Sequence, residues 1–157
     1  MTAFGALGSS LVELQRCGFF QWFNLEAAEM NGALTVFRPS GPTFRNDVAL
    51  EAWNGFGGAL TVLRLCLSRA FIDGTQWRAF ASDIVASFFR DVLGESALSV
   101  ALEEEAPVLL SPDEECLVQV YRGAKQSART AYGTLMLSGE NDTRNGVPVV
   151  IFSVAAR

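Results

Sequence analysis

The chain has 157 residues, of which half are hydrophobic and 18% are charged, and its formal net charge is −5. This length fits one domain, and such a high apolar content argues against intrinsic disorder. Proteins that bind nucleic acid or anionic membrane surfaces need a basic face, whereas the 12 basic residues here are scattered singly. We therefore expect one domain over residues 1–157, with neither nucleic acid nor membrane as a partner.

The first expected element is a short helix over residues 9–17, followed at once by a dense run of aromatic side chains. Ser9 or Ser10 can cap this helix. The aromatic run is too dense for a single buried face, whether it forms a helix or a strand. Exposed aromatic clusters mark interaction surfaces. We therefore predict a binding surface made of Phe19, Phe20, Trp22 and Phe23.

Three Asn-Gly pairs predict β-hairpins, because both residues tolerate the positive φ that a type I′ turn requires. The pairs begin at Asn31, Asn54 and Asn145. They would join residues 22–30 to 33–38, 48–53 to 59–69, and 135–144 to 147–154.

The third hairpin also predicts a register. With Asn145 and Gly146 as a two-residue loop, Leu137 lies opposite Val154 and Gly139 lies opposite Phe152. An aromatic ring over a glycine is a familiar cross-strand arrangement. A looser loop across residues 139–146 is the alternative.

Alternation of apolar residues predicts further strands. Over residues 60–72, Leu63, Leu65 and Leu67 point one way and the residues between them point the other way. Residues 96–102 also alternate. Residues 116–122 and 147–154 are apolar on both faces, which is typical of central strands. The acidic, proline-containing stretch between residues 103 and 115 is expected to be a loop with an extended middle at 108–110.

The strongest helical pattern covers residues 76–93. Its apolar stripe has helical spacing and comprises Trp77, Phe80, Ile84, Phe88 and Val92. We expect this helix to lie across one face of the sheet. Together with the hairpins, it predicts an α+β fold: a mostly antiparallel sheet packed against one long amphipathic helix, plus the short N-terminal helix.

Few residues point to catalysis. The chain has no histidine, which removes the commonest general base and zinc ligand. Tyr121 and Lys125 have the spacing of a catalytic Tyr-x-x-x-Lys pair, but no glycine-rich nucleotide motif accompanies them, and Gly123 favours a turn. Asp83 is expected to form a structural ion pair with Arg64 or Arg69. We expect no catalytic residue, cofactor or metal site.

Three widely spaced cysteines, Cys17, Cys66 and Cys116, favour reduced thiols rather than a disulfide framework or a zinc site. No secretory signal and no stretch of about 20 apolar residues is recognised, so we expect a cytoplasmic protein.

These features favour a non-enzymatic binding or adaptor protein that forms a homodimer and binds a protein partner through the aromatic surface. Size, acidity and α+β layout are similar to those of the small acidic chaperones that hold bacterial secretion substrates, although no motif carries that similarity. Two alternatives remain. One is a carrier with a pocket for a small apolar ligand between sheet and helix. The other is a histidine-free enzyme using Asp83, Tyr121 or Lys125.

Overall fold

The computed structural model describes residues 16, 18, 24–55, 59–93, 96–104 and 109–156. The described residues form one seven-stranded antiparallel sheet and four helices, which confirms the α+β class and the predicted antiparallel sheet. The finer expectation, one long helix plus a short N-terminal one, is not confirmed, because α4 (Arg78–Leu93) is accompanied by three further helices among the described residues. The helix predicted over residues 9–17 lies almost entirely outside the described residues.

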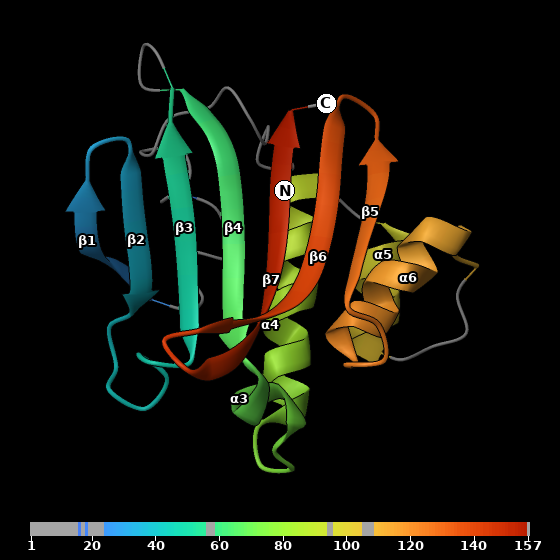
Figure 1. Cartoon of the computed structure of the whole chain (residues 1–157), viewed down its shortest axis with the longest axis horizontal. Helices are drawn as coiled ribbons and strands as arrows, with labels where there is room; N and C mark the ends of the chain where they lie inside the picture. Colours follow the sequence, from blue (N-terminus) through green and yellow to red (C-terminus); the bar gives the residue numbers. More distant parts are fainter. Residues whose placement is uncertain are drawn as a thin grey trace.

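The sheet is built from a meander of four strands followed, after the helices, by a second meander of three. The strand order across the sheet is β1-β2-β3-β4-β7-β6-β5, and every neighbouring pair is antiparallel (Figure 1). The pairing of β4 with β7 joins the two meanders. The strands are β1 (Leu25–Asn31), β2 (Leu34–Pro39), β3 (Val48–Asn54), β4 (Leu60–Ser68), β5 (Ser127–Tyr132), β6 (Leu135–Arg144) and β7 (Val147–Ala156).

The register predicted for the third hairpin is confirmed. Leu137 lies opposite Val154 and Gly139 lies opposite Phe152, with Asn145 and Gly146 at φ values of 53° and 79°. In the first hairpin the predicted turn is wrong by one residue. Asn31 pairs with Leu34, so the residues that make the turn are 32 and 33. Gly32 still supplies the positive φ, at 62°.

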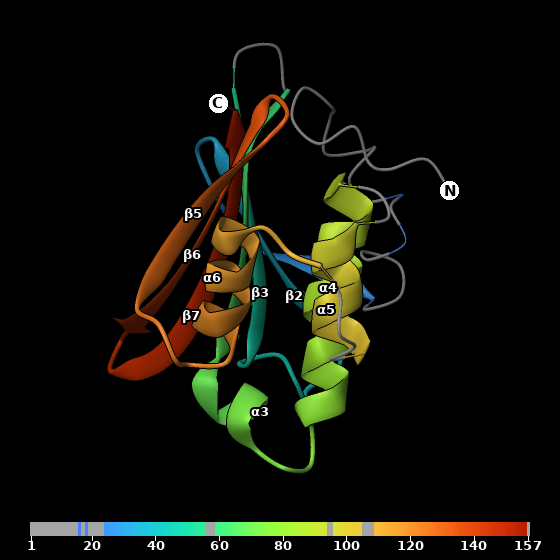
Figure 2. The ribbon, with the colours of Figure 1, turned by 90° about the vertical axis from the view of Figure 1, so that its right-hand side faces the viewer.

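The helices are α3 (Arg69–Asp73), α4 (Arg78–Leu93), α5 (Ala97–Glu104) and α6 (Pro112–Tyr121). The last three lie on the same side of the sheet, with α6 beside β5 and β6 (Figure 2). Ser68 ends β4 and also caps α3, since its hydroxyl accepts a hydrogen bond from the backbone N–H of Phe71.

Two predicted strands are wrong, and helices occupy both ends of the predicted loop. Of the predicted strand over residues 96–102, residues 97–102 belong to α5, where Leu98, Ala101 and Leu102 are buried at helical spacing. Residues 116–121 belong to α6, which begins at Pro112 inside the predicted loop. Ser111 and Glu114 form a capping box there, and the acidic first turn suits the positive end of the helix dipole. Strand β5 was not predicted.

The main core lies between the sheet and the helices. Leu63, Leu65 and Leu67 point into it from β4, as the alternation predicted. On the helix side, Ile84 and Phe89 of α4 are fully buried, and the core also includes residues from α3, α5 and α6.

The opposite face of the sheet carries no described helix. A smaller apolar cluster lies there, made of Val36, Ala49, Cys66, Val149 and Ile151. The closed end of the β6–β7 hairpin bends away from the helices and passes in front of β4 (Figures 1 and 2). We call this side the helix-free face. Within the part of the chain described, no helix is both long and apolar enough to cross a membrane.

Candidate functional site

The helix-free face contains a pocket of about 340 Å³ beside the bent end of the β6–β7 hairpin. Its floor is apolar and comes from neighbouring strands: Val36 on β2, Ala49 on β3, Cys66 on β4 and Val149 on β7. Alternation along each strand places these four side chains on one face, because their neighbours in sequence point into the main core.

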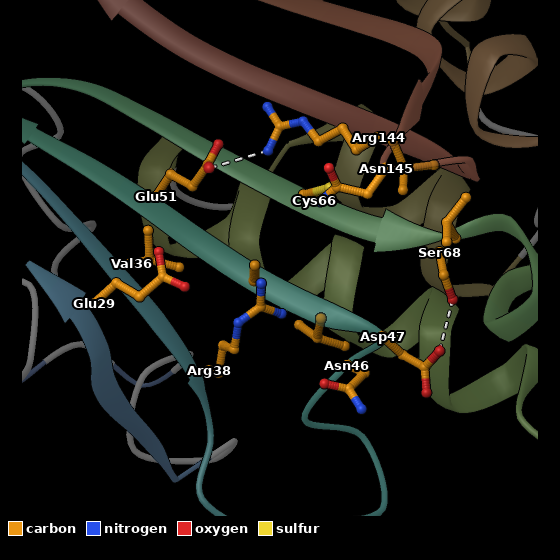
Figure 3. Close-up of a pocket in the computed structure, with 14 residues that line it drawn as sticks. Glu29, Val36, Arg38, Asn46, Asp47, Glu51, Cys66, Ser68, Arg144 and Asn145 are labelled. Atoms are coloured by element: carbon orange, nitrogen blue, oxygen red, sulfur yellow. Dashed lines mark hydrogen bonds and ion pairs between the residues drawn. The ribbon is translucent and has the colours of Figure 1, made fainter.

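Charged side chains surround this floor. Arg144, next to the hairpin turn, reaches across to β3, where its Nη1 donates to Oε2 of Glu51 at 3.0 Å (Figure 3). The side chain of Glu51 is 13% exposed and that of Arg144 is 35% exposed. The ion pair therefore ties the hairpin end to the middle of the sheet and closes one side of the pocket.

Asp47, Arg38 and Glu29 complete the charged lining of the pocket. Asp47 accepts a hydrogen bond of 2.7 Å from the hydroxyl of Ser68, and Arg38 donates to a backbone carbonyl oxygen, that of Arg45, at 3.1 Å. These bonds hold the two side chains in place without neutralising either of them. The lining thus has three carboxylates and two guanidinium groups, which favours a positively charged occupant.

One oxygen of Glu51 is left without a donor. Its Oε1 is buried and accepts no hydrogen bond from any described residue, while Oε2 is held by Arg144. A buried acceptor left unsatisfied costs about 1–3 kcal/mol, so the Glu51 carboxylate retains unused hydrogen-bonding capacity at the wall of the pocket.

Two further groups in the pocket have perturbed pKa values. Burial raises the pKa of the Cys66 thiol, and the nearby charge of Arg144 opposes that rise only in part. Desolvation works against the charge of Arg144, but the hydrogen bond and charge of Glu51 outweigh it, so the pKa of Arg144 is raised. Cys66 is therefore protonated at neutral pH, and Arg144 stays charged.

A second hollow of about 460 Å³ lies on the same face, across β4, β7, β6 and β5. Its centre is one cross-strand row in which each residue is the register partner of the next: Arg64 on β4, Ser153 on β7, Ser138 on β6 and Arg129 on β5. We call this row and the hollow around it the polar groove. The guanidinium carbon of Arg64 lies 4.7 Å from the ring centroid of Trp53.

Of the residues that the sequence suggested for catalysis, Asp83 lies on α4, and Tyr121 and Lys125 do not share a helix because α6 ends at Tyr121. Tyr121 is buried at the end of α6, whereas Lys125 is exposed in the next loop, after Gly123 at a φ of 80°. The ion pair expected between Asp83 and Arg69 is wrong, since Arg69 is the first residue of α3 and pairs with Asp73 at 2.7 Å.

The predicted aromatic surface falls outside the described part of the chain. Phe19, Phe20, Trp22 and Phe23 lie outside the described residues, as does Cys17. Cys66 and Cys116 are free thiols. Within the described ranges, no group of three or more histidine, cysteine, aspartate or glutamate side chains could hold a metal ion.

Sequence reasoning missed both hollows. Glu51 and Arg144 are 93 positions apart, and no local pattern connects them. The one available signal was the outward position of Arg64, Cys66 and Ser68 on β4, which shows that this face is polar but not what lies beside it. Searches among protein-family models, curated proteins and solved structures found no match to this chain.

Proposed function

We propose that the protein is a non-enzymatic binding protein and that the pocket beside the β6–β7 hairpin holds a small organic molecule with a cationic, N–H-donating group. The observation that carries this proposal is the charge of the lining, in which three carboxylates, those of Glu29, Asp47 and Glu51, stand against two guanidinium groups. The Oε1 of Glu51 also lacks a donor among the described residues. The volume of about 340 Å³ falls in the range of roughly 300–1,000 Å³ typical of ligand pockets.

The apolar floor and the charged rim of the pocket would contact different parts of a ligand. The apolar floor would remove an alkyl or ring portion of the ligand from water, at roughly 25 cal/mol per Å² buried. A protonated amine would meet the carboxylates of Glu29, Asp47 and Glu51, which outnumber the guanidinium groups of the lining. Because the Cys66 thiol has a raised pKa, it suits a packing role better than that of a nucleophile.

Cys66 provides a direct test, because its labelling by N-ethylmaleimide reports access to the pocket floor. The experiment uses a protein in which Cys17 and Cys116 are serine, with native mass spectrometry to detect any co-purified molecule. Three probes share one alkyl chain: hexylamine, hexanol and hexanoate. We expect hexylamine to slow labelling at the lowest concentration and hexanoate to be the weakest. In Glu51→Gln the advantage of hexylamine over hexanol should shrink.

The outcomes separate the parts of the proposal. If none of the three probes slowed labelling and no bound mass were found, the pocket would not be a binding site. If hexanoate protected as well as hexylamine, the cationic assignment would be wrong. The variant Glu26→Gln is the control, since Glu26 pairs with Arg45 outside the pocket and its loss should leave protection unchanged.

Binding of a protein partner or of a second copy of the chain is the second candidate function. The observation in its favour is the edge of the sheet at β1, which pairs with β2 alone among the described strands and begins two residues after the segment Phe19–Phe23. Met30 on this strand is 76% exposed. Light scattering should then report a homodimer or a complex. Phe20→Ala and Trp22→Ala should weaken that association without loss of stability. Destabilisation of about 3–5 kcal/mol, as for a core aromatic, would instead place these side chains in the core.

A further inference from the structure

We infer that the polar groove is a second binding site, separate from the pocket, and that it binds a phosphate group. The groove offers two guanidinium groups, from Arg64 and Arg129, and two hydroxyls, from Ser138 and Ser153, in one continuous row across four strands. All four are hydrogen-bond donors to an oxyanion.

The two arginines lie at opposite ends of the row, with the two serines between them. Arg64 and Arg129 are three strand steps apart, which is about 14 Å between backbones. The guanidinium of Arg64 lies over Trp53 on β3, so its side chain would turn toward β7 to meet an anion. The short serines leave the hollow of about 460 Å³ open. A tetrahedral oxyanion over the two serines would accept from both hydroxyls and from Arg129, and from Arg64 once that side chain turns away from Trp53.

The electrostatics of the row also favour an anion. Glu51 is the direct cross-strand partner of Arg64, yet its carboxylate bonds Arg144 instead. The guanidinium of Arg64 stacks on Trp53, and its buried Nε donates to no described residue. Glu140 is the acidic side chain of the groove lining, against two arginines. Arg64 is therefore incompletely compensated, and an anionic ligand would supply what Glu51 does not.

The test measures unfolding temperature against phosphate concentration at constant ionic strength, with chloride as the replacement ion. The probes are inorganic phosphate, glycerol 3-phosphate and acetate. We expect both phosphates to raise the midpoint in a saturable way and acetate to act at least tenfold more weakly. The hollow is larger than one phosphate ion, so tighter binding of glycerol 3-phosphate would assign a phosphorylated small molecule. Equal binding would assign free phosphate.

Substitutions inside and outside the groove test whether the residues of the row bind the phosphate. Arg129→Gln should weaken phosphate binding at least fivefold, whereas Arg122→Gln removes the same charge from an exposed arginine outside the groove and should not. Ser138→Ala tests the row without changing charge and should also weaken binding. Midpoints without phosphate show whether each variant folds. No midpoint shift up to 20 mM phosphate, equal weakening in both arginine variants, or acetate binding as tightly as phosphate would each overturn the inference.

Discussion

Replacing Gly139 by alanine tests the part of the fold on which both hollows depend, the pairing of β6 with β7. A Cβ at this position would lie 3.0 and 3.1 Å from ring carbons of Phe152 and 3.2 Å from Cδ2 of Leu117. Ordinary carbon–carbon contacts are about 3.5–4.0 Å. Neither neighbour can easily move, since both are buried and Phe152 packs edge-on against Phe89 at 5.4 Å.

The magnitude follows from two opposing effects. Overpacking a filled core costs about 1–3 kcal/mol. Removing the extra backbone freedom of a strand glycine returns roughly 0.5–1 kcal/mol. Gly139→Ala should therefore lower the free energy of unfolding by about 0.5–2 kcal/mol. Gly41→Ala is the matched control, because its added Cβ meets no described atom within 4 Å and its φ is not in the left-handed region.

Urea unfolding followed by circular dichroism measures both variants against the parent chain. The midpoint should fall for Gly139→Ala with an unchanged m-value, and should stay equal or rise for Gly41→Ala. If Gly139→Ala were as stable as Gly41→Ala, Phe152 would not lie over Gly139. The register that places Ser138 beside Ser153 would then fail as well.

Two further predictions concern groups with shifted pKa values. Because burial raises the pKa of Cys66, its labelling by N-ethylmaleimide should be slower at pH 7.5 than that of Cys116 and should accelerate as the pH rises; comparable rates at pH 7.5 would contradict the burial. The buried neutral thiol contributes its full stability at pH values below the pKa that the thiol has in the unfolded chain. That contribution is lost as the pH rises through the higher pKa of the folded state. Desolvation and the nearby charge of Glu103 raise the pKa of Asp83. The folded state therefore favours the protonated carboxyl, and the protein loses stability as the pH rises and Asp83 becomes charged. Asp83→Asn should therefore raise the urea midpoint at pH 7 but not at pH 3, and an unchanged midpoint at pH 7 would contradict this reasoning.

Local signals predicted local structure well. The register of the β6–β7 hairpin followed from Asn145–Gly146, because few residue pairs accept two consecutive positive φ values. The inward leucines of β4 followed from strict alternation. Both features are decided by residues within about ten positions of each other.

Short apolar segments were the place where prediction failed. Leu98, Val100 and Leu102 alternate, but Leu98, Ala101 and Leu102 also have helical spacing, so eight residues cannot decide between the two periods. For α6, the capping box at Ser111 was the better evidence, and the apolar run that follows it was misread as a central strand.

The candidate sites were beyond prediction because they depend on the pairing of β4 with β7, which are separated in sequence by all four helices and two strands. That pairing brings Arg64 to Ser153 and sets the hairpin end over Cys66. No turn signal encodes it; it follows from how the two meanders share one helix-covered core. Even a correct prediction of every strand would not locate the two hollows unless the order of the strands were also known.

The two faces of the sheet carry different kinds of side chain. The helix-covered face buries large side chains and supplies stability, whereas the helix-free face keeps small floor residues between long charged ones. Cys66 lines the pocket and Arg64 lines the groove, and the two are alternate residues of β4. Their backbones are therefore about 7 Å apart along the strand, and the two hollows are neighbours. Their charge balances are opposite, with carboxylates in excess in the pocket and guanidinium groups in excess in the groove. A face with this separation of charge is complementary to ligands that carry both signs, and helices packed over it would have removed that property.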